Sequence, residues 1–220
     1  MEYTRYGFTQ AVAAFFEMPT ADARNLLPRH LQPLEVQHTR SILAITAFEF
    51  TESMVGEYNE IVLSIIVPPR VDPGQPLPKS AFFPFIVGTT TDSSREHAIE
   101  RWHLPHYMKA LDIRLDPEDD VMQVTVSDNG AQILDMTVTS HQFAPVRDLY
   151  NSFMVDGDDN YKVNIYMDGP HAEHEEERGS LTLYEHPMTK GLTLPDVSSY
   201  AFREQWLKGG MQTFEELERI

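Results

Sequence analysis

The sequence contains no cysteine among its 220 residues. This absence excludes disulfides, thiol nucleophiles and thiolate metal sites together. No run of about 18 apolar residues occurs either, so no membrane span is predicted. The N-terminal stretch 1–16 lacks a basic region followed by an apolar core and a small-residue cleavage site, and no signal peptide is therefore predicted. These absences favour a cytoplasmic protein.

Basic residues are also scarce, with 17 lysines and arginines against 34 aspartates and glutamates and a net charge of −17. Binding to phosphate backbones depends on basic groups, so nucleic acid and anionic membranes are disfavoured as partners. Hydrophobic residues make up 41% of the chain, which is enough to build a substantial core. The length fits one domain and no linker or internal repeat divides it, so we predict a single domain over residues 1–220.

Several stretches have the composition of β-strands. Residues 41–50 and 58–67 are rich in β-branched and apolar side chains, and residues 81–89 are apolar enough for a third buried strand. Residues 161–167 and 180–185 follow as further strands. Because strands dominate and only a few stretches favour helices, the sequence predicts one α+β domain.

Two connections have distinctive chemistry. Residues 121–139 alternate about an Asn-Gly pair at 129–130, whose tolerance of positive φ suits the type I′ turn of a β-hairpin. Residues 68–80 contain five prolines, which remove the hydrogen-bond donors of a strand, so this stretch is predicted to be a loop. Long loops of this kind are often lids or binding loops, and a simple surface excursion is an equal alternative.

Two stretches indicate helices. Residues 93–104 form one candidate, in which Ser93 and Glu96 have the spacing of a capping box. The tail from Ser198 onward is expected to form two short helices that are separated by Gly209–Gly210.

Several motifs fail on inspection. Residues 156–167 begin like a calcium loop, but Tyr161 and Met167 occupy the positions that need glycine and glutamate, so an acidic turn is predicted. His171 and His174 could share a face and bind a metal, yet no second histidine completes an HExxH motif, and a solvated loop is favoured. No glycine-rich phosphate loop occurs. We predict no metal site and no cofactor.

One candidate for chemistry is the entrance of the strand at 58–67, where Tyr58 and Glu60 precede an apolar run. A carboxylate there would be partly desolvated and its pKa raised, as a buried acid or base requires. The alternative is that Glu60 faces solvent at the exposed end of the strand, and spacing alone favours this position.

The second candidate is the stretch "ERWHLPHYMKALDI" at 100–113, where Pro105 ends the preceding helix. His103, His106 and Tyr107 could project into a cavity, and neutral histidines there could orient a carbonyl or anionic ligand or transfer protons. The alternative is that both histidines lie on the surface at a helix end.

Taken in order, three segments resemble the acetoacetate decarboxylase superfamily. They are "LLPRHLQPLEV" at 26–36, the stretch 42–67 with the specific pattern G-x-Y-N-E at 56–60, and "ERWHLPHYMKALDI" at 100–113, which resembles the family's active-site segment. The resemblance covers roughly residues 20–115.

This resemblance implies a strongly curved, cone- or barrel-like antiparallel sheet that encloses a small-molecule cavity, with a few peripheral helices, in a homo-oligomer. The decarboxylases of this family place a lysine directly after the proline of the active-site segment. That lysine forms a Schiff base with a β-keto acid, and apolar surroundings or a neighbouring cation activate it.

The sequence departs from the family pattern at the reactive position. The residue after Pro105 is His106, which cannot form the stable imine. Lys109 matches the family's second lysine, which supplies positive charge rather than the nucleophile. Ile45 stands where decarboxylases carry a second pocket carboxylate, whereas Glu60 carries over with its motif intact.

Two hypotheses for function follow. In the first, the chain is an enzyme in which Glu60 and His106, with His103 nearby, form an acid–base pair that acts on a small carbonyl or carboxylic compound. Hydration, dehydration and enol chemistry all suit such a pair, and the activity would be of a lyase type.

In the second hypothesis the chain binds a hydrophobic or carbonyl-containing ligand without catalysis. Its cavity would be lined by Phe48, Tyr58, Trp102 and Tyr107. A third alternative keeps decarboxylation, with Lys109 as the imine-forming lysine.

Overall fold

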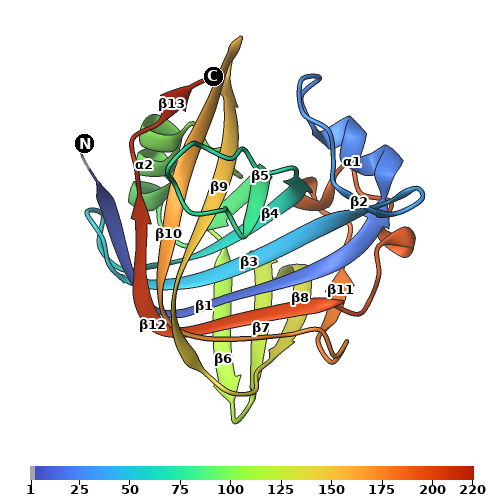
Figure 1. Cartoon of the computed structure of the whole chain (residues 1–220). Coiled ribbons are helices and arrows are strands. Elements are labelled where there is room, and N and C mark those ends of the chain that lie inside the picture. The colour runs from blue at the N-terminus through green and yellow to red at the C-terminus, as the bar shows by residue number, and fades with distance from the viewer. Residues whose placement is uncertain (1–2) are drawn as a thin grey trace.

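The computed structural model describes residues 3–220, and strands form most of it (Figure 1). Seven long strands close into a barrel in the order β1 (Thr4–Pro19), β12 (Arg203–Phe214), β10 (Asp159–His174), β9 (Ala144–Asp156), β5 (Ser80–Thr89), β4 (Tyr58–Val67) and β3 (Arg40–Glu52). The barrel is closed because β3 also pairs with β1. Neighbouring strands run antiparallel except β5 and β9, which pair in parallel over residues 80–82 and 150–152.

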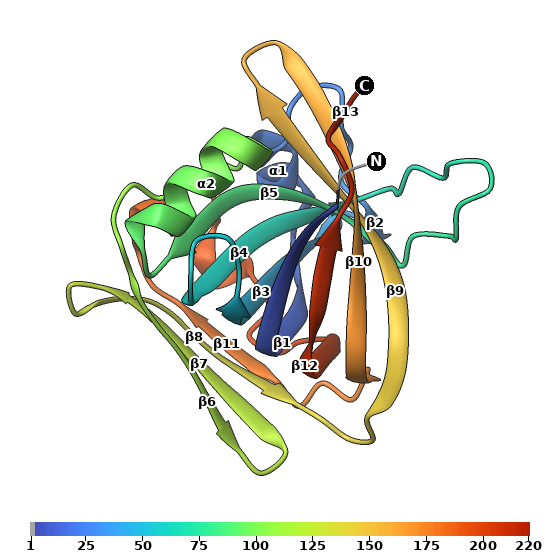
Figure 2. The same ribbon diagram turned by 90° about the vertical axis from the view of Figure 1, so that its left-hand side faces the viewer.

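A smaller antiparallel sheet of four strands packs against the outside of the barrel (Figure 2). Its order is β11 (Ser180–Leu183), β8 (Ala131–Thr139), β7 (Val121–Asp128) and β6 (Asp112–Glu118). Alternate residues of β4 explain the packing. Ile61, Leu63 and Ile65 belong to the core cluster that includes the small sheet, whereas the residues between them face the barrel interior. Both faces of β4 are therefore covered, which explains its nearly continuous apolar run.

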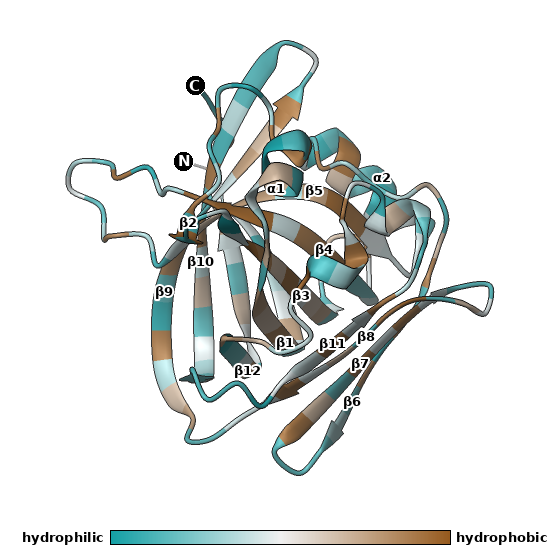
Figure 3. Ribbon diagram, turned by 90° about the vertical axis from the view of Figure 1, so that its right-hand side faces the viewer, coloured by the Kyte–Doolittle hydropathy of each residue, from teal (hydrophilic) through white to brown (hydrophobic). Residues whose placement is uncertain are grey.

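The remaining elements are short. They are α1 (Thr20–Leu26), α2 (Asp92–Trp102), the 3-10 turns η1 (Pro187–Thr189) and η2 (Leu194–Asp196), β2 (Glu35–Gln37) and β13 (Glu218–Arg219). Figure 3 shows that hydrophobic residues concentrate where the barrel and the small sheet face each other, while the projecting loops are mainly hydrophilic. Among residues 3–220, no helix is both long and apolar enough to cross a membrane.

The architecture expected from the sequence is confirmed, since a strongly curved, mainly antiparallel sheet encloses a cavity and few helices accompany it. The strands predicted at 41–50, 58–67 and 81–89 are β3, β4 and β5. The hairpin at 121–139 is β7 and β8, with φ of 49° at Asn129 and 84° at Gly130.

The other strand predictions are confirmed as well. Residues 161–167 lie within β10 and residues 180–183 form β11. The proline-rich stretch 68–79 contains no helix or strand and projects from the barrel (Figure 2). The acidic stretch at 157–158 is the turn that joins β9 to β10.

The helix at 93–104 is confirmed as α2, but the predicted capping box is wrong. The side chain of Thr91 caps the helix by accepting a hydrogen bond from the backbone N–H of Ser94. Ser93 is therefore the second residue of the helix rather than its cap. The helix ends at His103, whose φ of 53° places it in the left-handed region typical of a C-terminal cap.

The two helices predicted for the tail are wrong, because residues 203–214 form β12. Gly209 and Gly210 do not break a helix. Gly209 has a φ of 67°, and a Cβ at Gly210 would lie 2.2 Å from the carbonyl oxygen of Asp168 on β10. The glycine pair thus allows two barrel strands to approach closely at an irregularity in their register.

Candidate active site

A cavity of about 120 Å³ lies inside the barrel. All seven barrel strands contribute to its wall, together with Trp102 at the end of α2 and Leu104 just after it. Most lining residues are apolar. Besides Glu60 and the indole N–H of Trp102, the polar groups of the wall belong to uncharged side chains, namely Thr46, Ser64, Tyr150, Ser152, Gln205 and Gln212. An apolar cavity of about 150 Å³ holds a benzene-sized molecule, so this one suits a ligand of about six non-hydrogen atoms.

Glu60 is the one carboxylate among the described residues that line the cavity, and no lysine or arginine is among them. It lies on β4 between Phe48 and Thr89 of the neighbouring strands and is only 9% exposed. Within residues 3–220, no side chain or backbone group makes a hydrogen bond to its carboxylate. Burial raises the pKa of Glu60 to about 8, so the carboxyl group is mostly protonated at pH 7.

Aromatic residues pack close to Glu60. The indole N–H of Trp102 donates to the hydroxyl of Tyr6 at 2.7 Å, and that hydroxyl lies 2.7 Å from Nε2 of His97. Since Tyr6 accepts from Trp102, its own proton is available to His97. Burial raises the pKa of Tyr6 to about 12, and the charge of Glu60 adds to the increase. Burial, and then Glu60, raises the pKa of Tyr58 as well.

His106 is placed away from the cavity wall. Its backbone forms a parallel bridge with Val87 on β5. Both ring nitrogens are buried without a hydrogen-bond partner within residues 3–220. Burial, with a smaller contribution from Arg95, lowers the pKa of His106 to about 4, which keeps the ring neutral. In the described part of the chain no hydrogen bond or ion pair joins it to Glu60.

His103 and the residues after His106 also point elsewhere. The ring of His103 stacks on Tyr161 with centroids 4.8 Å apart, and its Nδ1 lies 3.3 Å from Asp156. Tyr107 and Lys109 donate hydrogen bonds to the same oxygen of Asp128, at 2.6 and 3.0 Å. These three side chains join the end of β7 to the segment after α2.

The lysine considered for an imine is therefore an exposed ion-pair partner. Its side chain is 62% exposed, and the hydrogen bonds with Asp128 and Tyr107 raise the pKa of Lys109. The hydrogen bond from Tyr107, and then that from Lys109, lowers the pKa of Asp128 to about 2. An imine-forming lysine needs the opposite shift, because only the neutral amine attacks a carbonyl.

Of the site residues predicted from the sequence, Phe48, Glu60 and Trp102 line the cavity. Tyr58 packs in the same aromatic cluster without reaching the wall. The structure does not bring the remaining candidates to the cavity, namely His103, His106, Tyr107 and Lys109.

Sequence reasoning missed the contributions of β9 and β12. Tyr150 and Ser152 lie on β9, and Gln205 and Gln212 lie on β12. The alternation Tyr150–Ser152–Met154 is a strand signal that could have indicated one wall. The residues of β12 gave no such signal, because its polar side chains were compatible with a helix.

A closed barrel around a small apolar cavity with one desolvated acid has the properties of a small-molecule site. The family model described as acetoacetate decarboxylase (ADC) matches residues 3–190, so the chain belongs to the acetoacetate decarboxylase family. The resemblance noted in the sequence is thereby confirmed. A search of curated proteins gives no match.

Several solved structures share the fold. A structure from structural studies of acetoacetate decarboxylase is 14% identical with a TM-score of 0.69, and covers 100% of this chain and 89% of that one. Acetoacetate decarboxylase from Legionella pneumophila subsp. pneumophila str. Philadelphia 1 is 15% identical with a TM-score of 0.65, and the match covers 99% of this chain and 87% of that one. The enduracididine biosynthesis enzyme MppR complexed with pyruvate is 10% identical with a TM-score of 0.66, and the match covers 99% of this chain and 89% of that one.

Proposed function

We propose that this chain is an enzyme that binds a small carbonyl compound in the barrel cavity and uses Glu60 as a general acid and base. The observation that carries the proposal is a single carboxyl group in a mostly apolar wall whose described residues include no lysine or arginine, with a pKa of about 8. Such a group can both donate and accept a proton near neutral pH, which is what acid–base catalysis requires. Membership of the decarboxylase family and the pyruvate complex of MppR support a carbonyl substrate class.

The lining favours an uncharged carbonyl compound over a free carboxylate. No lysine or arginine among the described residues lines the cavity, so a buried carboxylate ligand would have no cationic partner. Burying an unpaired charge is unfavourable, whereas a neutral carbonyl needs only one hydrogen bond. The protonated Glu60 supplies that bond, since its O–H donates to the carbonyl oxygen.

Enol chemistry follows from this arrangement. Once bound, the carbonyl is polarised by the protonated Glu60. The O–H of Glu60 gives its proton to the carbonyl oxygen while the other carboxyl oxygen takes a proton from the carbon next to the carbonyl, so that the C–H electron pair forms the C=C bond of an enol and Glu60 ends as a carboxylic acid again. Loss of water from a β-hydroxy carbonyl continues from this enol, because the carboxyl O–H of Glu60 protonates the leaving hydroxyl group and the carboxylate then takes the proton of the enol O–H. Both reactions belong to acid–base chemistry and need no imine.

The proposal differs from Schiff-base decarboxylation in one testable respect. Lys109 is exposed and its pKa is raised, and the position after Pro105 is His106. Borohydride trapping with small ketones and keto acids, read by intact mass and peptide mapping, should therefore give no adduct. A stable adduct on Lys109 would establish the decarboxylase alternative.

The direct test follows deuterium from solvent into the carbon next to the carbonyl of small ketones by NMR. Wild type should catalyse the exchange, and Glu60→Gln should lower its rate by about 10²–10⁴-fold, the range for loss of a general acid or base. Glu57→Gln is the matched control, because Glu57 is exposed in the turn before the same strand. Equal rates for wild type and Glu60→Gln would contradict the role of Glu60.

The second candidate is a binding protein without catalysis, which the mostly apolar wall favours. Under this alternative, wild type and Glu60→Gln bind small ketones and neither accelerates exchange. A catalytic role for His106, which was predicted from the sequence, stays a prediction, as does assembly into a homo-oligomer, which the family resemblance implies. Light scattering after size-exclusion chromatography tests the assembly.

A further inference from the structure

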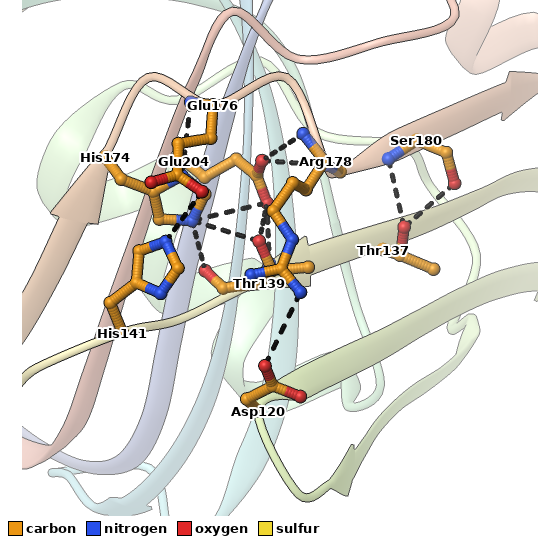
Figure 4. A network of polar contacts seen from close by, with 10 residues as sticks. Asp120, Thr137, Thr139, His141, His174, Glu176, Arg178, Ser180 and Glu204 are labelled. Carbon is orange, nitrogen blue, oxygen red and sulfur yellow. Dashed lines mark hydrogen bonds and ion pairs between the residues drawn. The ribbon is translucent and has the colours of Figure 1, made fainter.

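Side chains from three segments meet outside the barrel cavity, at the junction between the barrel and the small sheet (Figure 4). His141 lies in the connection from β8 to β9, His174 is the last residue of β10, and Glu176 lies in the loop that follows. One nitrogen of each imidazole and one carboxylate oxygen lie within 4.8 Å of one another. The two rings have centroids 4.6 Å apart, and Nε2 of His141 is 3.0 Å from Oε2 of Glu176.

The imidazole of His174 is fixed in position. Its side chain is 7% exposed, and Nε2 lies 3.0 Å from both the carbonyl oxygen and the hydroxyl of Thr139. A backbone carbonyl that accepts a ring N–H is the usual support for a metal-binding histidine, because it orients the ring and fixes its tautomer. Nδ1 accepts only a long hydrogen bond of 3.4 Å, from the backbone N–H of Glu176.

The electrostatic surroundings favour a cation. The fully buried carboxylate of Glu204 lies 3.9 Å from Nε2 of His174, and Glu176 adds a second negative charge. Two basic residues lie nearby, and each has an acidic partner that offsets its charge. The guanidinium of Arg178 lies 3.6 Å from Asp120, and that of Arg203 lies 2.5 Å from Glu175. His141 and Glu176 are partly exposed, so an ion can enter from solvent.

We propose that His141, His174 and Glu176 bind one divalent transition-metal ion of the zinc type, with water in the remaining position. Two imidazole nitrogens and a carboxylate oxygen are the ligands of many zinc sites, whereas calcium and magnesium prefer oxygen ligands throughout. Zinc–ligand bonds of about 2.0–2.1 Å place tetrahedral ligands about 3.3 Å apart. The two exposed side chains therefore move inward by rotation, while His174 stays in place.

Such an ion would join two parts of the fold. His174 belongs to a barrel strand, whereas Thr139 is the last residue of a strand in the small sheet and His141 follows that strand. The ion would hold the barrel and the small sheet together, and its binding free energy would add to the stability of the folded chain. None of its three ligands lines the barrel cavity, so the site is independent of the proposed enzymatic function.

The test uses the full chain without an affinity tag, treated with EDTA and dialysed. Titration with Zn²⁺ in a calorimeter should show one ion per chain, and Ca²⁺ or Mg²⁺ should not compete. At 100 times the dissociation constant, Zn²⁺ should raise the melting temperature by about 5–10 °C. Co²⁺ should give the visible absorption of a low-coordinate site.

His141→Ala and Glu176→Gln are the informative variants, because both side chains are exposed and their loss should not prevent folding. Each should weaken Zn²⁺ binding by more than about tenfold and remove the Co²⁺ absorption. The matched controls, His38→Ala and Glu177→Gln, change exposed residues of the same types and should bind like wild type. Absence of one-to-one binding, or equal affinity in wild type, His141→Ala and Glu176→Gln, would overturn the proposal.

Discussion

Two buried glutamates in this chain have opposite surroundings. Glu204 at the junction of the two sheets is fully buried and accepts hydrogen bonds from the backbone N–H groups of Thr139, Arg178 and Gly179 and from the Thr139 hydroxyl. Glu60 in the barrel is nearly as buried, yet nothing within residues 3–220 donates to it. The same side chain is thus solvated by the protein at one place and left unpaired at the other.

The difference separates a structural carboxylate from a reactive one. Four donors compensate Glu204 for its lost hydration, so it fastens the β10–β11 loop to β8. Glu60 receives no such compensation, and its pKa of about 8 reflects the unfavourable burial of its charge. A group that is destabilised by its surroundings and faces a cavity is a candidate for catalysis.

The largest effect should be the pH dependence of stability that Glu60 causes. Its pKa rises from about 4.3 in the unfolded chain to about 8 in the folded one. The folded chain therefore has its full stability, as far as Glu60 is concerned, below about pH 4.3, and it loses this contribution as pH rises through 8. Between pH 5 and pH 9, wild type should lose on the order of 4 kcal/mol relative to Glu60→Gln. Urea unfolding at several pH values measures this difference. Parallel pH profiles would show that Glu60 is solvated after all.

Glu204→Gln should follow, with a loss of about 2–4 kcal/mol in the free energy of unfolding at pH 7. The amide cannot accept hydrogen bonds from all four donors, and its own N–H₂ would face the backbone N–H groups. Glu60→Gln at the same pH should instead raise the free energy of unfolding by on the order of 3 kcal/mol, because the wild-type carboxyl group must take up a proton to fold at pH 7 and the amide need not. Urea midpoints of the two variants give the comparison directly. A loss of stability in both variants would remove the distinction between the two glutamates.

A third effect concerns His106, whose buried ring has the opposite pH response. Its pKa falls from about 6.5 in the unfolded chain to about 4 in the folded one. The contribution of the neutral ring to the free energy of unfolding is therefore complete above pH 6.5 and is lost as pH falls toward 4. Wild type should lose up to about 3 kcal/mol over that range relative to His106→Leu. The deuterium-exchange assay on the same variant checks its chemistry. Unchanged exchange would place His106 outside the reaction, and abolished exchange would restore the predicted pair with Glu60.

The smallest effect should come from Lys109→Met. Lys109 is an exposed partner of Asp128, so its loss should leave the urea midpoint within error and the exchange rate unchanged. The pKa of Asp128 should rise toward its ordinary value but stay below it, because Tyr107 still donates to the carboxylate. NMR titration of the Asp128 carboxyl carbon provides the measurement. Loss of exchange activity would instead indicate that Lys109 reaches the substrate.

Local chemistry accounts for the parts of the fold that could be predicted. Asn129–Gly130 specifies its own turn, and the apolar runs of β3, β4 and β5 are too continuous to be surface strands. The prediction of helices in the tail was wrong because pairing with distant strands decides its structure. Residues 203–214 lie between β1 and β10, and neither neighbour is visible in the local sequence.

The candidate site was partly predictable for the same reason. Glu60 has a fixed place in the G-x-Y-N-E pattern, and strand alternation then turns it into the barrel with Val62 and Ser64. The segment after Pro105 was harder to predict. Its backbone runs along β5 through the bridge at Val87, and this pairing, rather than its composition, directs His106 away from the cavity.

The position of β12 has a consequence for how the chain acquires its shape. The strand is among the last elements in the sequence, yet it separates β1 from β10 and forms ladders with both. During synthesis the other six barrel strands leave the ribosome before it does, and until it arrives they can form only an open, curved sheet. Both β1 and β10 then present unpaired edges, which are prone to association with other chains. Closure of the barrel is therefore a late and non-local event, of the kind that makes folding slow.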